Sequence, residues 1–131
     1  MICLDSSFLI DFLKNDNGAV EKMKNLKEEN FSISAIGVFE VALGFYLMKE
    51  FSSAKYEKFR EIIGEIELLK LDLKSSILSS KISASLAKEG KIIGQSDCLI
   101  AGTMISNGIG NILTNDKEHF SRIKGINVIS Y

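Results

Sequence analysis

No proline and no tryptophan occur among the 131 residues of this chain, and it has only one histidine and two cysteines. Without proline-rich or low-complexity segments, nothing in the sequence marks a linker between domains. One histidine and two cysteines cannot supply a tetrahedral zinc set or a disulfide framework, so we interpret Cys3 and Cys98 as reduced core thiols. We therefore expect a single domain over residues 1–131.

An excess of charge of one sign is also lacking, because 17 acidic residues face 16 basic ones and the net charge is −1. No global positive field attracts polyanions, so any contact with nucleic acid must be local. The longest apolar stretch, residues 34–48, is interrupted by Glu40 and is too short to span a membrane. The amino terminus has no basic start followed by a cleavage region, so we expect a cytoplasmic protein without membrane contact.

What the chain does contain is 46% hydrophobic residues, grouped in segments that alternate between strand-like and helix-like patterns. Short apolar runs predict strands at residues 1–4, 31–34, 66–71, 111–113 and 127–129. Helical spacing predicts helices at residues 6–14, 20–27, 35–48, 52–64, 73–86, 96–107 and 119–123. This alternation predicts a three-layer α/β/α fold with a mostly parallel sheet.

Three details of these helices are open to a structural test. The helix over residues 35–48 is almost wholly apolar, so we expect it to be buried. Ser96 is a suitable N-cap for the helix that follows it, and Gly90 is a suitable terminator of the helix before it.

Two acidic residues follow strands of the predicted sheet. Asp5 ends the first apolar run, and Asp116 follows the run at residues 111–113. Asp97 falls in the first turn of a helix, from where its carboxylate can point toward the same edge. Ligands bind beyond the carboxyl ends of parallel strands, because loops and helix amino termini leave a crevice there. The sequence therefore gathers three aspartates near one candidate site.

Glu40 is the most informative acidic residue, because it stands alone in an apolar helix where burial of a charge is costly. No lysine or arginine occurs between Lys27 and Lys49, so a local ion pair cannot neutralise it. A bound cation can do so. The alternative is that Glu40 reaches solvent at the edge of its helix.

The aspartates also have an alternative interpretation as helix caps, because unpaired N–H groups at a helix start favour them. As a set, however, four carboxylates at one sheet edge would repel one another without a divalent cation among them. An open cluster of oxygen ligands is what Mg²⁺ and Mn²⁺ prefer. The sequence thus predicts a metal site formed by Asp5, Glu40, Asp97 and Asp116.

Four segments carry a resemblance to a known family. Residues 4–11 (LDSSFLID), 34–44 (SAIGVFEVALG), 94–101 (GQSDCLIA) and 113–120 (LTNDKEHF) resemble the four acidic motifs of the PIN-domain ribonucleases. The similarity covers essentially the whole length, and it is greatest to the VapC-type toxins of prokaryotic toxin–antitoxin pairs. Asp11 is often acidic in that family too, but it lies on the first helix away from the edge and is left out of the site.

The resemblance implies about five parallel strands with Asp5 near the centre of the sheet. It also implies a metal-dependent endoribonuclease that hydrolyses RNA phosphodiesters through a water activated by Mg²⁺ or Mn²⁺. Asp5 and Asp97 are then the expected direct ligands, with Glu40 and Asp116 completing the shell or acting through waters. The expected partners are RNA, a second copy of the chain in a homodimer, and an antitoxin protein.

Three polar residues are candidates for a supporting role in this site. Ser6, Thr114 and Asn115 can hydrogen-bond the carboxylates or the scissile phosphate, although helix capping and turn formation explain them equally well. His119 lies beyond the fourth acid, and we interpret it as a surface or packing residue outside the site.

Two other function classes remain open at this stage. A metal-dependent phosphohydrolase or DNA nuclease can use the same carboxylates, although Ser7 stands where a phosphoaspartate mechanism needs its second acid. The domain can alternatively be a catalytically silent module that binds a partner protein through apolar helix surface.

Overall fold

The computed structural model describes residues 1–131 and contains five strands and seven helices. The strands are β1 (Ile2–Leu4), β2 (Phe31–Ser34), β3 (Glu67–Leu69), β4 (Asn111–Leu113) and β5 (Asn127–Ile129). The helices are α1 (Ser6–Leu13), α2 (Asn17–Asn25), α3 (Ala35–Leu47), α4 (Ser53–Glu65), α5 (Leu73–Lys88), α6 (Gln95–Ser106) and α7 (Lys117–Phe120).

All five strands form one sheet in the order β3-β2-β1-β4-β5, and every neighbouring pair is parallel. The predicted α/β fold with a parallel sheet of five strands is therefore confirmed. Strand β1 is central, and its carboxyl end leads directly into Asp5. The carboxyl ends of β1 and β4 are adjacent, because Leu4 pairs with Leu113.

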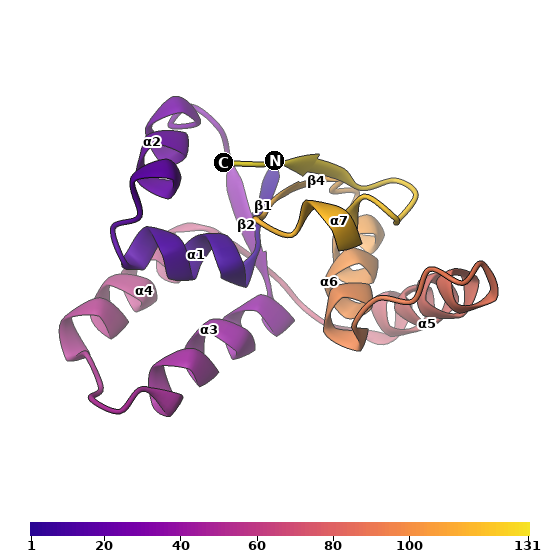
Figure 1. Cartoon of the computed structure of the whole chain (residues 1–131), viewed down its shortest axis with the longest axis horizontal. Helices are drawn as coiled ribbons and strands as arrows, with labels where there is room; N and C mark the ends of the chain where they lie inside the picture. The colour runs from indigo at the N-terminus through magenta and orange to yellow at the C-terminus, as the bar shows by residue number, and fades with distance from the viewer.

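Helices cover both faces of the sheet, so the molecule has three layers (Figure 1). Successive side chains of a strand point to opposite faces. Ile2 and Leu4 accordingly pack with α1, α2, α3 and α4, whereas Cys3 packs with α5, α6 and α7. The two cysteines are buried and free, as predicted.

Helices α5 and α6 pack unusually closely against each other. A side chain at Gly102 of α6 would meet the Ser79 backbone, with the nitrogen 2.7 Å and the Cα 2.8 Å from the added Cβ. Only glycine permits this approach. The contact places the start of α6, which carries Asp97, relative to the sheet.

Helix α3 corrects one prediction, because it is not buried all round. Gly37, Val41 and Phe45 face the core, but Phe39, Tyr46 and Leu47 are 62%, 65% and 74% exposed. One side of the helix lies against α1, α6 and β2, whereas Phe39 and Leu47 on the other side are mostly exposed. The apolar composition of α3 therefore reflects an open surface as well as the core.

Several helix boundaries also differ from the sequence prediction, and α2 begins at Asn17 rather than at residue 20. Helix α6 begins at Gln95 with Gly94 as its N-cap, so Ser96 is inside the helix rather than its cap. The last helix is Lys117–Phe120, because Asp116 caps it earlier than the apolar pattern of residues 119–123 indicated. Gly90 does follow the end of α5 with a φ of 71°, as expected.

None of these helices has the length and apolar character that crossing a membrane requires. The expectation of one domain over residues 1–131 stays a prediction.

Candidate metal centre and active site

The fold brings the starts of three helices to the carboxyl edge of the sheet. Asp5 is the N-cap of α1, Asp97 lies in the first turn of α6, and Asp116 is the N-cap of α7. Glu40 comes from the middle of α3 and faces them from the other side of the sheet edge. Besides burial, the nearby charges of Asp5 and Asp97 raise the pKa of the Glu40 carboxyl.

Asp5 is the most buried of the four acids, with 6% of its surface exposed. Its Oδ2 accepts hydrogen bonds from Ser7 Oγ at 2.8 Å and from Thr114 Oγ1 at 2.7 Å. Burial raises the pKa of this carboxyl, and the two hydroxyls oppose that effect. The side chain makes no capping bond to α1. The capping interpretation therefore does not explain Asp5, whose second oxygen has no hydroxyl partner.

Glu40 is half-buried, and its Oε1 accepts a hydrogen bond of 3.2 Å from Ser6 Oγ. Burial raises the pKa of the Glu40 carboxyl, and the charges of Asp5 and Asp97 raise it further. No lysine or arginine forms an ion pair with it. Glu40 thus has a hydroxyl partner and acidic neighbours, and the half of it that is not buried remains in contact with solvent.

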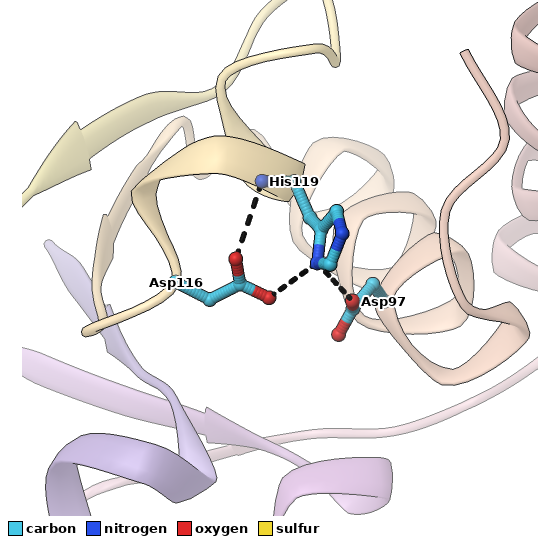
Figure 2. A group of neighbouring side chains, drawn as sticks. All are labelled: Asp97, Asp116 and His119. Carbon is cyan, nitrogen blue, oxygen red and sulfur yellow. Dashed lines mark hydrogen bonds and ion pairs between the residues drawn. The ribbon is translucent and has the colours of Figure 1, made fainter.

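Asp97 and Asp116 approach each other around the ring of His119 (Figure 2). His119 Nδ1 is 2.8 Å from Asp116 Oδ2 and 4.0 Å from Asp97 Oδ2. Burial, followed by repulsion from Asp5 and Asp116, raises the pKa of Asp97 from its ordinary value of 3.8 to about 6. One ligand atom from each of these three residues lies within 4.8 Å of the others.

The position of His119 corrects its sequence interpretation as a residue outside the site. Asp116 accepts the His119 backbone N–H at 3.2 Å, which begins α7 and turns the ring back over the same carboxylate. The available sequence pattern was the spacing Asp-x-x-His after a strand. That spacing places the two side chains together only when the aspartate caps a helix, and the structure has that turn.

The four acids lie close enough to repel one another, but their ligand atoms do not all lie within one small group. Repulsion couples Asp5 with Asp116, Glu40 with Asp5, and Asp97 with both aspartates. Asp5 and Glu40 lie outside the 4.8 Å group. No lysine or arginine pairs with any of the four, because the two ion pairs of such residues involve Glu89 and Glu118. The ring of His119 lies within ion-pair distance of Asp97 and Asp116, whereas Asp5 and Glu40 have no ion-pair partner. This set of oxygen ligands fits a hard divalent cation.

The three supporting residues take different positions. Ser6 contacts Glu40, and Thr114 contacts Asp5, as described above. Asn115 contributes its backbone N–H, which donates to Ser7 Oγ at 3.2 Å, and its side chain makes no hydrogen bond. Ser7 was missed as a supporting residue, although its place in the first turn after Asp5 could have indicated it.

Asp11 lies away from this group, as expected. Its Oδ2 accepts a hydrogen bond of 2.6 Å from the Tyr131 hydroxyl, which connects α1 to the last residue of the chain.

An acidic, uncompensated sheet edge in a parallel α/β domain is the architecture of a metal-dependent phosphotransfer or nuclease site. Comparison with known proteins narrows this class. The sequence profile of the PIN domain matches residues 2–126, and the chain belongs to the PIN-domain family. The resemblance found in the four motifs is thereby confirmed.

Several relatives span nearly the same length as this chain. It is 32% identical over 127 residues to the tRNA(fMet)-specific endonuclease VapC of Salmonella typhimurium, covering 95% of this chain and 93% of the relative. The protein of the same name from Shigella flexneri is 30% identical, with 94% and 92% covered. Ribonuclease VapC1 of Methanocaldococcus jannaschii is 32% identical, with 94% and 81% covered.

Solved structures show the same fold. The DNA-bound VapBC of Salmonella typhimurium superposes with a TM-score of 0.84 at 28% identity, covering 98% of this chain and 96% of that one. VapBC2 of Rickettsia felis, bound to a promoter DNA fragment, has a TM-score of 0.85 at 22% identity, with 100% and 99% covered. The second likeness concerns the fold alone.

Proposed function

We propose that this chain is a metal-dependent endoribonuclease and the toxin of a type II toxin–antitoxin pair. It hydrolyses RNA phosphodiesters at the acidic sheet edge. The relatives named endonuclease or ribonuclease are 30–32% identical over more than nine-tenths of this chain. Nucleases of the PIN family generally depend on divalent metal ions.

The observation that carries the proposal is the acidic group that no lysine or arginine neutralises. Burial and acidic neighbours raise the pKa of Asp97 to about 6, so it is unfavourable for all four carboxyls to be ionised at the same time. A Mg²⁺ or Mn²⁺ ion would offset this repulsion, lower the pKa of a bound water and stabilise the leaving oxygen. We expected Asp5 and Asp97 to be the direct ligands, but the ligand atoms of Asp97 and Asp116 lie within 4.8 Å of each other and Asp5 lies outside that group. Asp97 and Asp116 would therefore hold the ion directly, with Asp5 and Glu40 completing the shell or acting through waters.

The hydroxyl groups around the acids would orient them. Ser7 and Thr114 both donate to Oδ2 of Asp5, so neither hydroxyl occupies Oδ1, which would face a cation or a water. Ser6 holds Glu40 in the same way through Oε1. Such partners fix the direction of a ligand and tune its basicity.

Three rival functions are to be distinguished from this proposal. A phosphomonoesterase with an aspartyl-phosphate intermediate needs a second acid two positions after Asp5, where this chain has Ser7. A DNA nuclease would use the same acids on another polymer. In a binding module without activity, four carboxylates that lack a lysine or arginine partner would repel one another and only destabilise the fold.

The first prediction is that Asp97→Asn and Asp5→Asn abolish RNA cleavage while the fold survives, because each change removes one ligand charge at nearly constant volume. Purified protein freed of metal with EDTA is given Mg²⁺ or Mn²⁺ and one of four substrates: tRNA, total RNA, single-stranded DNA or a phosphomonoester. Cleavage of RNA that requires the metal is the expected result. Circular dichroism measures the fold of each variant.

Asp11→Asn is the matched control, because Asp11 lies outside the acidic group and asparagine can still accept the Tyr131 hydrogen bond. It should cleave RNA as the unaltered protein does. Full RNA cleavage by both site variants, or activity confined to the phosphomonoester, would contradict the proposed function.

We also propose that the antitoxin binds the groove between α1, α3 and α4, and that the toxin is a homodimer. The named complexes of VapBC support an antitoxin partner. The lining of the groove is mostly apolar and includes two lysines, Lys14 and Lys55. A peptide with apolar and acidic side chains fits this chemistry. The groove is lined by Ile10, Leu13, Lys14, Val41, Gly44, Phe45, Met48 and Lys55.

Gly44→Leu tests the groove, because Gly44 lines it and a Cβ there would meet no atom within 4 Å. The larger side chain should fill the groove and prevent antitoxin binding without disturbing the fold or RNA cleavage. Gly64→Leu is the control, since Gly64 is equally open and exposed on α4 but outside the groove. Binding of the product of a neighbouring small open reading frame is measured by calorimetry. Equal binding by both variants would refute this location.

A further inference from the structure

The only histidine of the chain lies against the acidic group, and the turn that carries it fixes its ring. Asp116 accepts the His119 backbone N–H through Oδ1 at 3.2 Å, and its Oδ2 lies 2.8 Å from Nδ1 of the same residue. Backbone and ring are therefore both held by one carboxylate. Nδ1 is directed into the site rather than toward solvent (Figure 2).

A second carboxylate from a different element faces the same nitrogen. Asp97 Oδ2, on α6, is 4.0 Å from Nδ1. In an octahedral shell with bonds of about 2.1 Å, neighbouring ligand atoms are about 3 Å apart and opposite ones about 4.2 Å. The two separations of Nδ1, 2.8 Å and 4.0 Å, match an adjacent and an opposite pair of ligands.

The other ring nitrogen leaves room for this role. When no ion is bound, Nδ1 of His119 donates its proton in the 2.8 Å hydrogen bond to Asp116 Oδ2. Nε2 makes no hydrogen bond with the protein, so the ring proton can be carried there instead, which leaves the Nδ1 lone pair for a cation. The nearby basic residue, Arg122, is paired with Glu118 and does not compete for the carboxylates.

We propose that Nδ1 of His119 is a direct ligand of the ion held by Asp97 and Asp116, and that it makes the centre favour Mn²⁺ over Mg²⁺. This inference rests on the metal site of the proposed function. Mg²⁺ is a hard ion that takes oxygen ligands and gives up water reluctantly, whereas first-row transition ions accept imidazole nitrogen readily. A set of two carboxylates and one imidazole therefore separates the two ions, which an all-carboxylate set does less well.

The decisive measurement is spectroscopic and uses the unaltered protein without a histidine tag. Mn²⁺ is added below one equivalent, and pulsed electron paramagnetic resonance detects nuclei bonded to it. The expected result is a ¹⁴N modulation that is replaced by a ¹⁵N signal when the protein is grown with ¹⁵N-labelled histidine. Because the chain has one histidine, the label reports His119 alone.

His119→Phe provides a second readout, because phenylalanine keeps a ring and removes the nitrogen. Calorimetry should show that the Mn²⁺ affinity of this variant is lower by about tenfold or more. Losing an outer-shell partner of a metal ligand costs about 10- to 100-fold in affinity, and losing a direct ligand should cost at least the lower of these values. Mg²⁺ affinity should fall by a smaller factor. The control is Glu118→Gln on the same helix, whose side chain is 76% exposed and faces Arg122. It should leave both affinities unchanged.

The outcomes distinguish this inference from the proposed function. If Mn²⁺ binds and Asp97→Asn abolishes its binding, but ¹⁵N-histidine leaves the spectrum unchanged, the His119 ligand is refuted and the metal site stands. Equal losses of Mn²⁺ and Mg²⁺ affinity in His119→Phe overturn the claimed selectivity. Failure of the unaltered protein to bind either ion overturns the inference and the proposed metal site together.

Discussion

Two hydroxyl groups, those of Ser7 and Thr114, hold the carboxylate of Asp5 in its orientation. Ser7 comes from the first turn of α1, and Thr114 follows β4 more than one hundred positions later. Their oxygens are also 3.2 Å from each other, so the two hydroxyls and the Asp5 carboxylate form one compact cluster. The most buried acid of the site therefore depends on the pairing of β1 with β4.

Ser7→Ala should lower the rate of metal-dependent RNA cleavage by about 10- to 100-fold, because outer-shell partners of metal ligands have effects of this size. The loss should appear in kcat rather than in KM, since Ser7 acts by positioning Asp5 through a hydrogen bond. Ser76→Ala is the control, because that hydroxyl binds only the Asp72 carbonyl. An unchanged kcat in Ser7→Ala would show that Thr114 alone is sufficient.

At the scale of elements, the position of α6 matters most because its first turn carries Asp97. Helix α6 is held by α5 on one side and by the sheet on the other. The closest approach is at Gly102, where an added Cβ would meet the nitrogen, Cα and hydroxyl of Ser79. Since the obstructing atoms include backbone, a rotamer change cannot relieve the contact.

Gly102→Ala should therefore destabilise the protein by roughly 1–3 kcal/mol, the usual cost of overpacking a core. Gly64→Ala should instead stabilise it by about 0.5–1 kcal/mol, because glycine is a poor helix residue and this position is open. Urea unfolding followed by circular dichroism measures both free energies. A neutral Gly102→Ala would mean that α5 and α6 can separate at no cost.

The whole molecule combines a nearly neutral chain with one locally acidic edge. The net charge of −1 conceals a group of four acids whose carboxyls have no lysine or arginine partner. Burial raises the pKa of Asp5, Glu40 and Asp97, with like charge adding to it. The folded protein therefore binds protons at this edge more tightly than the unfolded chain does.

The consequence is a pH-dependent stability in EDTA. Because the pKa of folded Asp97 is raised from 3.8 to about 6, its contribution favours folding at low pH and is lost as the pH rises from about 4 to about 6. The free energy of unfolding of Asp97→Asn minus that of the unaltered protein should therefore increase from about pH 4 to about pH 6. Guanidinium unfolding at a series of pH values measures the difference.

A divalent ion should reverse this effect above about pH 6, because a ligand that binds only the folded state stabilises it. The increase in stability with Mn²⁺ should be absent in Asp97→Asn. If the difference between the two proteins stays constant from about pH 4 to about pH 7, the raised pKa of Asp97 is contradicted.

The sequence by itself determined the order and type of most elements. Strand and helix periods are local properties, so the strands at residues 31–34, 111–113 and 127–129 were predicted at their observed bounds. The isolation of Glu40 among apolar residues and the placement of Asp5 after a strand also follow from the chain alone. These features required no knowledge of distant contacts.

Only the tertiary structure decided how the site is assembled and which surfaces are left open. Whether α3 is covered depends on its neighbours, and the sequence could not reveal that Phe39 and Tyr46 face outward. The bonds of Ser7 and Thr114 to Asp5 arise from the adjacency of β1 and β4. His119 joins Asp97 because α6 and α7 begin at the same edge, and a contact between separate elements is a property of packing, not of sequence spacing.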